Sequence, residues 1–175
     1  MATGRSNKIT GAVGEFLVAA ELNRRGLLAT PFSGNVPHYD IIASGEHGGH
    51  LPIQVKAVNK YTWQFDVSRF VEISFDGDKQ ILGQRLPTPY PDLFCVFVAI
   101  GDDHKSDRYF IFTWRALVDT IIDHHQRYLD KHSGVRPKNP RSTHCSIAMP
   151  ELQKFENDWD LIVRAVHKAA AQLGR

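Results

Sequence analysis

The sequence predicts a mixed α/β domain in which one helix precedes a single β-sheet and two helices follow it. Three observations support this class. Residues 11–25 have helical periodicity, residues 93–100 form a continuous apolar run typical of a central strand, and two short apolar segments flank a glycine-rich turn. The chain has 175 residues, of which 42% are hydrophobic and 23% charged, so we expect one domain spanning residues 1–175.

The first helix is bounded by recognisable end signals, with Thr10 as a candidate N-cap and Gly26 as the candidate C′ residue. Its main apolar stripe, which we expect to face the core, is formed by Val13, Phe16, Leu17 and Ala20. A second stripe contains one acid, Glu15, among Ala12, Ala19 and Leu22. Glu21 and Arg25 stand four residues apart and predict a surface ion pair.

The segments 38–42 and 52–56 predict a β-hairpin around the glycine-rich turn. Placing the midpoint of the hairpin in that turn puts Asp40 opposite Gln54, with Lys56 two residues further along on the same face. The opposite face collects apolar side chains and suits a core. Burying an acid and a lysine on a half-buried sheet costs free energy unless the two pair with each other or bind a ligand.

The remaining elements follow from apolar runs and turn signals. We expect strands over residues 27–32, 61–67, 93–100 and 108–112, helices over residues 113–132 and 151–173, and a proline-containing loop over residues 133–150. Residues 68–73 fit either a strand or a short helical turn, and both alternatives stay open.

The order of these polar residues resembles the PD-(D/E)XK nuclease superfamily. The matching residues are Glu15 on the first helix, Asp40 on the first hairpin strand, and Gln54-Val55-Lys56 on the second. The resemblance implies a restriction-endonuclease-like core, a central mixed β-sheet flanked by helices, here with extra C-terminal helices. The element order is similar to that of Holliday-junction resolvases, type IV restriction nucleases and an uncharacterised bacterial branch of the superfamily.

The resemblance also implies a chemistry, namely hydrolysis of a phosphodiester by a water activated on Mg²⁺ or Mn²⁺. Asp40, the side-chain oxygen of Gln54 and the Val55 carbonyl would hold the metal, and Glu15 would bind a metal water or a second ion. Lys56 would hold the attacking water and stabilise charge on the phosphate. The expected activity is a DNA endonuclease, and cutting both strands would require a homodimer.

Two departures from the family pattern leave an alternative open. His38-Tyr39 precedes Asp40 where a proline is usual, and Gln54 stands where an acid is usual. An amide oxygen is a neutral and weaker ligand for Mg²⁺. The alternative is therefore a catalytically inactive nuclease fold that serves as a nucleic-acid-binding or interaction module. A plain cross-strand salt bridge between Asp40 and Lys56, with Glu15 at the surface, is the simplest alternative for the residues themselves.

A basic loop formed by Lys131, Arg136, Lys138 and Arg141 predicts phosphate contacts, although such a loop can equally be a solvated surface. Tyr61 and Trp63 could stack on bases, and the alternative for Trp63 is a place in the core. The residues that we expect to contact nucleic acid are Arg136, Lys138, Arg141 and Trp63.

The composition limits the other function classes. A net charge of +2 permits a nucleic-acid partner without arguing for one, and two cysteines are too few for a disulfide framework or a four-cysteine zinc site. Cys95 lies in the central apolar run and is expected to be a buried thiol. Among the nine histidines, His124, His125, His132 and His144 lack a paired cysteine or carboxylate at metal-ligand spacing. No apolar stretch is long enough to span a membrane, so we expect a cytoplasmic protein.

Overall fold

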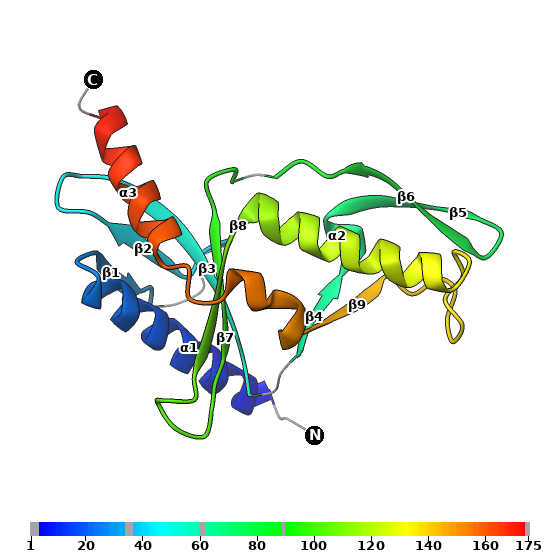
Figure 1. The fold of residues 1–175 in the computed structure, drawn as a ribbon, viewed down its shortest axis with the longest axis horizontal. Helices are drawn as coiled ribbons and strands as arrows, with labels where there is room; N and C mark the ends of the chain where they lie inside the picture. Colours follow the sequence, from blue (N-terminus) through cyan, green and yellow to red (C-terminus); the bar gives the residue numbers. More distant parts are fainter. Residues whose placement is uncertain (1–3, 34–36, 60–61, 89, 174–175) are drawn as a thin grey trace. The chain divides into compact units, whose positions relative to one another are not determined.

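The computed structural model describes residues 4–33, 37–59, 62–88 and 90–173 (Figure 1). The chain divides into two compact units. Unit 1 contains Met1–Tyr61, Asp92–Trp114 and Pro150–Arg175, and unit 2 contains Thr62–Pro91 and Arg115–Met149. The expectation of one nuclease-like domain stays a prediction.

Unit 1 is built on a five-stranded mixed sheet with the order β1-β2-β3-β7-β8. Its strands are β1 (Leu28–Pro31), β2 (Ile41–Ser44), β3 (His50–Val58), β7 (Phe94–Ala99) and β8 (Arg108–Thr113). Neighbouring strands are antiparallel except for β3 and β7, which are parallel. All six residues of β7 are buried, as expected for a central strand. The predicted mixed α/β class is therefore observed.

Two helices flank the sheet in unit 1, namely α1 (Gly4–Arg24) and α3 (Asp160–Leu173). Both contribute to one apolar cluster with the sheet face that carries Ile53, Val96 and Ile111. The opposite face carries Cys95, Phe97, Phe110 and Phe112, all buried. On this second face the ring of Phe155 lies with its centroid 4.3 Å from that of Phe112.

The two ends of α1 differ in how well the sequence predicted them. The helix begins before residue 10, so Thr10 is not its N-cap; its hydroxyl instead donates to the Ser6 carbonyl at 2.9 Å within the helix. At the other end Gly26 has φ 81° and the Leu27 N–H donates to the Leu22 carbonyl at 3.1 Å. This geometry confirms Gly26 as the C′ residue of a Schellman motif.

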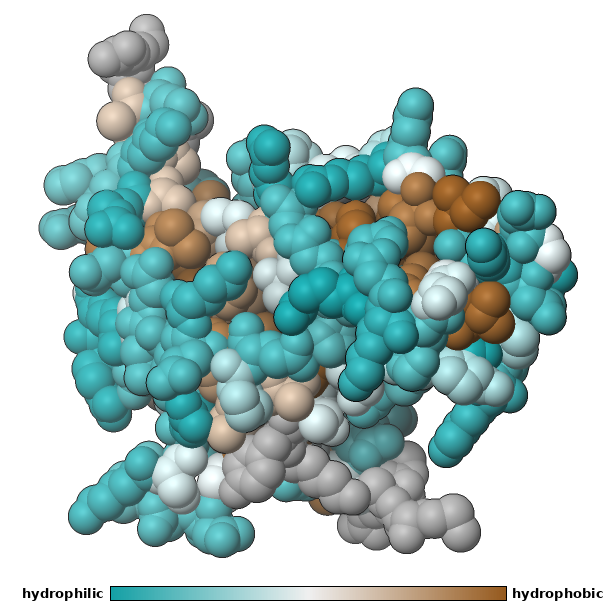
Figure 2. All heavy atoms as spheres, turned by 45° about the vertical axis from the view of Figure 1, so that its right-hand side comes forward, coloured by the Kyte–Doolittle hydropathy of each residue, from teal (hydrophilic) through white to brown (hydrophobic). Residues whose placement is uncertain are grey.

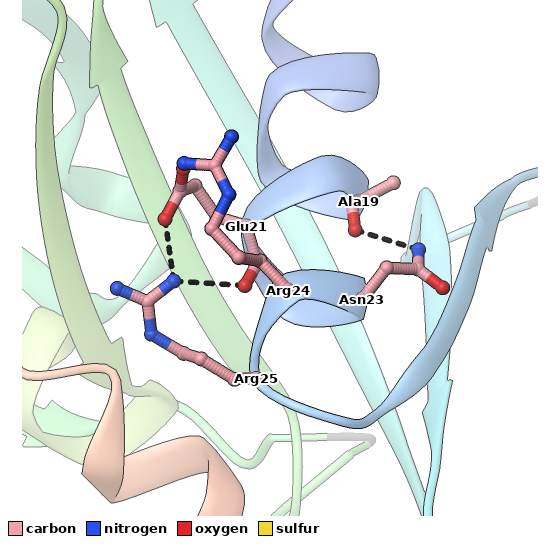
Figure 3. A network of polar contacts seen from close by, with 5 residues as sticks. All are labelled: Ala19, Glu21, Asn23, Arg24 and Arg25. Atoms are coloured by element: carbon pink, nitrogen blue, oxygen red, sulfur yellow. Dashed lines mark hydrogen bonds and ion pairs between the residues drawn. The ribbon is translucent and has the colours of Figure 1, made fainter.

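Polar side-chain contacts stabilise the last turns of α1, as Figure 3 shows. Glu21 forms ion pairs with Arg24 and Arg25, so the predicted pair with Arg25 is confirmed. The Asn23 side-chain amide donates to the carbonyl oxygens of Ala19 at 2.7 Å and Ala29 at 2.6 Å. The second of these bonds fixes the end of the helix to β1.

The expected packing face of α1 is wrong. The side chain of Phe16 is 66% exposed and that of Val13 is 39% exposed, whereas Val18 and Leu22 are fully buried. The buried positions are Thr10, Gly14, Val18 and Leu22, a row that matches neither predicted stripe and shares only Leu22 with the second, together with Ala19 of that second stripe. Gly14, within this row, lets the helix backbone approach β3.

The predicted helix over residues 151–173 is in fact two elements. Met149–Phe155 is a 3₁₀ helix, and α3 begins only at Asp160. The break coincides with Asn157, whose φ of 56° is incompatible with a continuous helix. Beside it, the Glu156 carboxylate accepts two hydrogen bonds from the Arg108 guanidinium at 2.6 and 2.5 Å. This ion pair to β8 holds the chain out of helical register.

Unit 2 contains two antiparallel strand pairs and one helix. The pairs are β4 (Thr62–Asp66) with β9 (His144–Ala148), and β5 (Val71–Asp76) with β6 (Lys79–Arg85). The helix is α2 (Trp114–Lys131), close to its predicted range. Residues 68–73 divide between a 3₁₀ turn, Val67–Arg69, and the start of β5. Strand β9 lies where a loop was expected, so that expectation is wrong for residues 144–148.

Figure 2 shows apolar residues reaching the surface among hydrophilic ones. The exposed large apolar side chains of the β5–β6 pair are Phe75 and Ile81. In the part of the chain that the structure describes, we find no helix that is long and apolar enough to cross a membrane.

Candidate functional site

The hairpin of β2 and β3 has the register that the sequence predicts. Ile41 pairs with Ile53, and the Asp40 N–H donates to the Ile53 carbonyl at 2.8 Å. Asp40 therefore stands opposite Gln54, just before the first residue of β2. Ile41 and Ile53 are fully buried on one face, and Gln54 and Lys56 lie on the other because side chains alternate along a strand.

The Asp40 carboxylate is fixed by the neighbouring strand. Its Oδ2 accepts a hydrogen bond from the Val55 N–H at 2.7 Å. Burial raises the pKa of Asp40, and the Val55 hydrogen bond and the charge of Lys56 oppose that rise. Asp40 is thus a partly desolvated carboxylate held in one orientation, which is the state in which an acid gains most from a cation.

Glu15 comes near Asp40 from α1, a helix that packs on the Ile53 face of the sheet and not on the face that carries Gln54 and Lys56. Its side chain is half-buried, and its pKa is raised first by burial and second by the negative charge of Asp40. The helix lies so close to β3 at Gly14 that a β-carbon added there would be only 2.4 Å from the β-carbon of Ala57. Glu15 as a metal-site residue stays a prediction.

Cys95 forms the wall behind the hairpin. It pairs with Gln54 across the β3–β7 ladder and is 1% exposed, which confirms the expected buried thiol. Burial raises the pKa of Cys95 to about 12, while the charge of Lys56 lowers it and that of Asp40 raises it further. The charges of Asp40 and Lys56 therefore both act on Cys95, which is the ladder partner of Gln54, so Asp40, Gln54 and Lys56 lie in the same patch.

The donors in this patch suit a hard cation. Asp40 and Glu15 supply carboxylates, and Gln54 and Val55 supply an amide and a backbone carbonyl oxygen. Oxygen ligands with room for water are what Mg²⁺ prefers. Within the described residues there is no group of three or more histidine, cysteine or acidic side chains that could hold a metal. The donor set fits Mg²⁺ or Mn²⁺ only if Gln54 or a backbone carbonyl takes part.

The predicted basic loop lies in unit 2 and is partly anchored on aromatic rings. The Arg136 guanidinium lies 4.8 Å from the Tyr128 ring centroid, and that of Arg141 lies 4.4 Å from the Phe75 ring centroid. Lys138 is exposed. These contacts hold the two arginines in place while leaving Lys138 in solvent, so the loop presents an ordered set of cations.

The stacking prediction for Trp63 is wrong. The Trp63 side chain is 2% exposed and points to the buried face of β4, so no base can reach its ring. The alternation of residues 62–66 predicted both this strand and its apolar face, and the core alternative holds. Tyr61, the other candidate for stacking, lies outside the described residues.

Sequence reasoning missed a buried polar cluster under the basic loop. His125 is 1% exposed and hydrogen-bonds to the Gln80 Oε1 at 3.0 Å, and the Gln80 Nε2 donates to the carbonyls of Pro140 and Ser142 at 2.6 and 2.9 Å. Because Gln80 Oε1 can only accept, His125 donates from Nε2, and burial lowers the pKa of His125 to about 4, which favours its neutral form. The sequence signal is a polar residue at an apolar helix position.

Comparison with solved structures supports the fold. The chain is similar to the structure of a bacterial homing endonuclease, I-Ssp6803I, with a TM-score of 0.50 and 17% sequence identity. The match covers 95% of this chain and 97% of that chain. No family model matches the sequence, and no curated protein matches it. The likeness establishes a nuclease-like arrangement of the sheet and helices, and the chemistry rests on the residues themselves.

Proposed function

We propose that this chain is a metal-dependent nuclease that hydrolyses phosphodiester bonds of DNA. The observation that carries the proposal is the register of β2 and β3, which sets Asp40 opposite Gln54, with Glu15 near enough for the charge of Asp40 to raise its pKa. Two neighbouring carboxylates that are both partly desolvated gain from a nearby cation. The structural neighbour's description as a homing endonuclease supports the same class.

The residues divide the work as follows. Asp40, Gln54 Oε1 and the Val55 carbonyl would hold Mg²⁺ or Mn²⁺, with Glu15 on a metal water or second ion. When bound, the metal would lower the pKa of water and offset charge on the phosphate. Lys56 would orient the attacking water and donate to a non-bridging phosphate oxygen. The Val55 N–H keeps Asp40 aimed during these steps.

The test is cleavage of plasmid DNA with Mg²⁺ or Mn²⁺. Asp40→Ala and Lys56→Ala should each lower the rate by a factor of about 100 or more, as expected for groups acting in the transition state. Glu46→Ala in the hairpin turn and Lys168→Ala on α3 are matched controls, since both side chains are exposed and lie outside the patch. Cleavage that persists in both site variants rejects the assignment.

A second candidate function is supported by one specific observation, the amide at Gln54. A nuclease fold without catalysis would bind nucleic acid and need not hold the ion. Titration calorimetry with Mn²⁺ separates the two candidates, because only the nuclease requires metal binding that Asp40→Ala abolishes. Gln54→Glu restores the usual acid, and a gain of cleavage in that variant would identify the natural chain as a weakened or inactive form.

A further inference from the structure

Strands β4 and β9 form a two-stranded ribbon whose two faces differ in chemistry. The outer face carries polar side chains, with Gln64 paired to Ser146 and Asp66 paired to His144. All four are exposed, and the Gln64 Nε2 donates to the Ser146 hydroxyl at 3.0 Å. The inner face is apolar and buried, and it consists of Trp63, Phe65, Cys145 and Ile147. The ribbon thus has a buried apolar inner face and an exposed outer face rich in hydrogen-bonding groups.

The segment that leads into β9 is strongly cationic. Residues 131–149 contain Lys131, Arg136, Lys138 and Arg141 and no aspartate or glutamate. Arg141 and the ends of both ribbon strands line one surface hollow of about 420 Å³. Arg141 therefore lies beside the polar face of the ribbon, as expected for a surface that binds a polyanion.

This cationic segment is held in position by buried and partly buried bonds. Gln80, itself bonded to the buried His125, holds the Pro140 and Ser142 carbonyls. The Thr143 hydroxyl donates to Asp66 Oδ1 at 2.6 Å, which fixes the loop to the end of β4. Asp66 Oδ1 also accepts from Ser68, so this carboxylate is engaged within the protein. The loop and the ribbon form one preorganised surface.

We propose that the outer face of the β4–β9 ribbon reads base edges in the major groove of duplex DNA, while Lys138 and Arg141 contact the flanking phosphates. The major groove admits a two-stranded ribbon, and a glutamine such as Gln64 can make a bidentate contact to adenine. Ser146 and His144 add donors and acceptors on the same face. The inference rests on DNA being the substrate, and it adds sequence selectivity to the proposed nuclease.

Duplex DNA is favoured over duplex RNA by groove geometry. The major groove of A-form RNA is deep and narrow, so side chains on a ribbon cannot read it. Single strands are usually held by exposed aromatic rings, whereas the aromatic side chains of this ribbon, Trp63 and Phe65, face inward. A preference for RNA is therefore an outcome that would count against the proposal.

The test uses the full wild-type chain in EDTA, so that binding is measured without cleavage. Repeated selection from a random duplex library should enrich a defined motif. Gln64→Ala should then lower affinity for the selected duplex about tenfold or more and leave affinity for random duplex unchanged. Lys138→Ala should lower both affinities alike and reduce the slope of log K against log salt by about one. Gln84→Ala, an exposed glutamine on β6, is the matched control.

The outcomes separate this inference from the proposed function. Duplex binding with no enriched motif, or a motif whose affinity is unchanged in Gln64→Ala, His144→Ala and Ser146→Ala, overturns base reading by the ribbon. Stronger binding to duplex RNA overturns it as well. A selected motif that depends on the ribbon, in a chain that never cleaves with Mg²⁺ or Mn²⁺, supports the inference and rejects the nuclease. Cleavage without ribbon-dependent selectivity does the reverse.

Discussion

Gly14 on α1 and Ala57 on β3 approach so closely that a β-carbon on Gly14 would lie 2.4 Å from the Ala57 β-carbon. This contact sets the distance between the helix and the sheet, and Glu15 is the next residue in the helix. At the same end of β3, the Asn59 amide donates to the Thr10 hydroxyl at 2.8 Å. Both contacts lie within one or two turns before Glu15 and hold this part of the helix against β3, which positions the Glu15 carboxylate relative to Asp40.

Gly14→Ala should therefore destabilise unit 1 by about 1–3 kcal/mol, the usual range for overpacking a close contact. An alanine in a helix is otherwise favourable by about 1 kcal/mol relative to glycine. Gly11→Ala is the control, because a β-carbon there meets nothing within 4 Å, and it should stabilise the helix. Urea denaturation measures both variants.

The contact also predicts a rescue. Ala57→Gly removes the opposing β-carbon, so Gly14→Ala combined with Ala57→Gly should recover most of the stability lost by Gly14→Ala alone. Metal affinity measured by calorimetry should fall in Gly14→Ala and return in the double variant, because the helix regains its distance from β3. If the double variant is no more stable than Gly14→Ala, the clash does not set the helix position.

Asp40→Asn should affect stability in a pH-dependent way. The folded-state pKa of Asp40 is raised, mainly by burial, so the protonated form favours folding at acid pH and that contribution is lost as pH rises through the folded pKa. An asparagine is neutral throughout and can still accept the Val55 N–H. Without metal, Asp40→Asn should match or exceed the wild-type melting temperature at pH 7, and the difference should shrink toward pH 4.

Asp66→Asn provides a control of opposite sign. The pKa of Asp66 is lowered, first by the Thr143 hydrogen bond, so its contribution to stability is present above the unfolded pKa and is lost as pH falls. Asp66→Asn should be most destabilising at pH 7. Equal pH dependence of stability in Asp40→Asn and Asp66→Asn would contradict the environments assigned to the two carboxylates.

Mg²⁺ should raise the melting temperature of the wild type but not of Asp40→Asn.

The sequence predicted the hairpin well because its register depends on local features. The alternation that buries Ile41 and Ile53 leaves Gln54 and Lys56 on the other face, and the turn fixes which residue stands opposite Asp40. Strand β9 was missed because it pairs with β4 across a long sequence separation and sits among prolines. The packing face of α1 was missed because Gly14, rather than the apolar Phe16, decides how close the helix comes.

His125 should make unit 2 less stable in mild acid. Burial, aided by the charges of Arg136 and His124, lowers its pKa to about 4. The neutral form favours folding above the unfolded pKa near 6.5, and this contribution, on the order of 3 kcal/mol, is lost as pH falls toward 4. His125→Gln keeps a donor for Gln80 and should flatten this part of the stability profile. His47→Gln, in the exposed hairpin turn, retains His125 and should leave the slope in place.

The two faces of α1 give a last prediction. Leu22 is fully buried in the core of unit 1, so Leu22→Ala removes buried methyl groups and leaves a cavity, which should cost about 2–5 kcal/mol. Phe16 is 66% exposed, and Phe16→Ala should change the free energy of unfolding by no more than about 0.5 kcal/mol. Urea titration of both variants measures the contrast within one helix. A large loss from Phe16→Ala with little from Leu22→Ala would mean that α1 packs through its more apolar stripe, and Glu15 would then point away from Asp40.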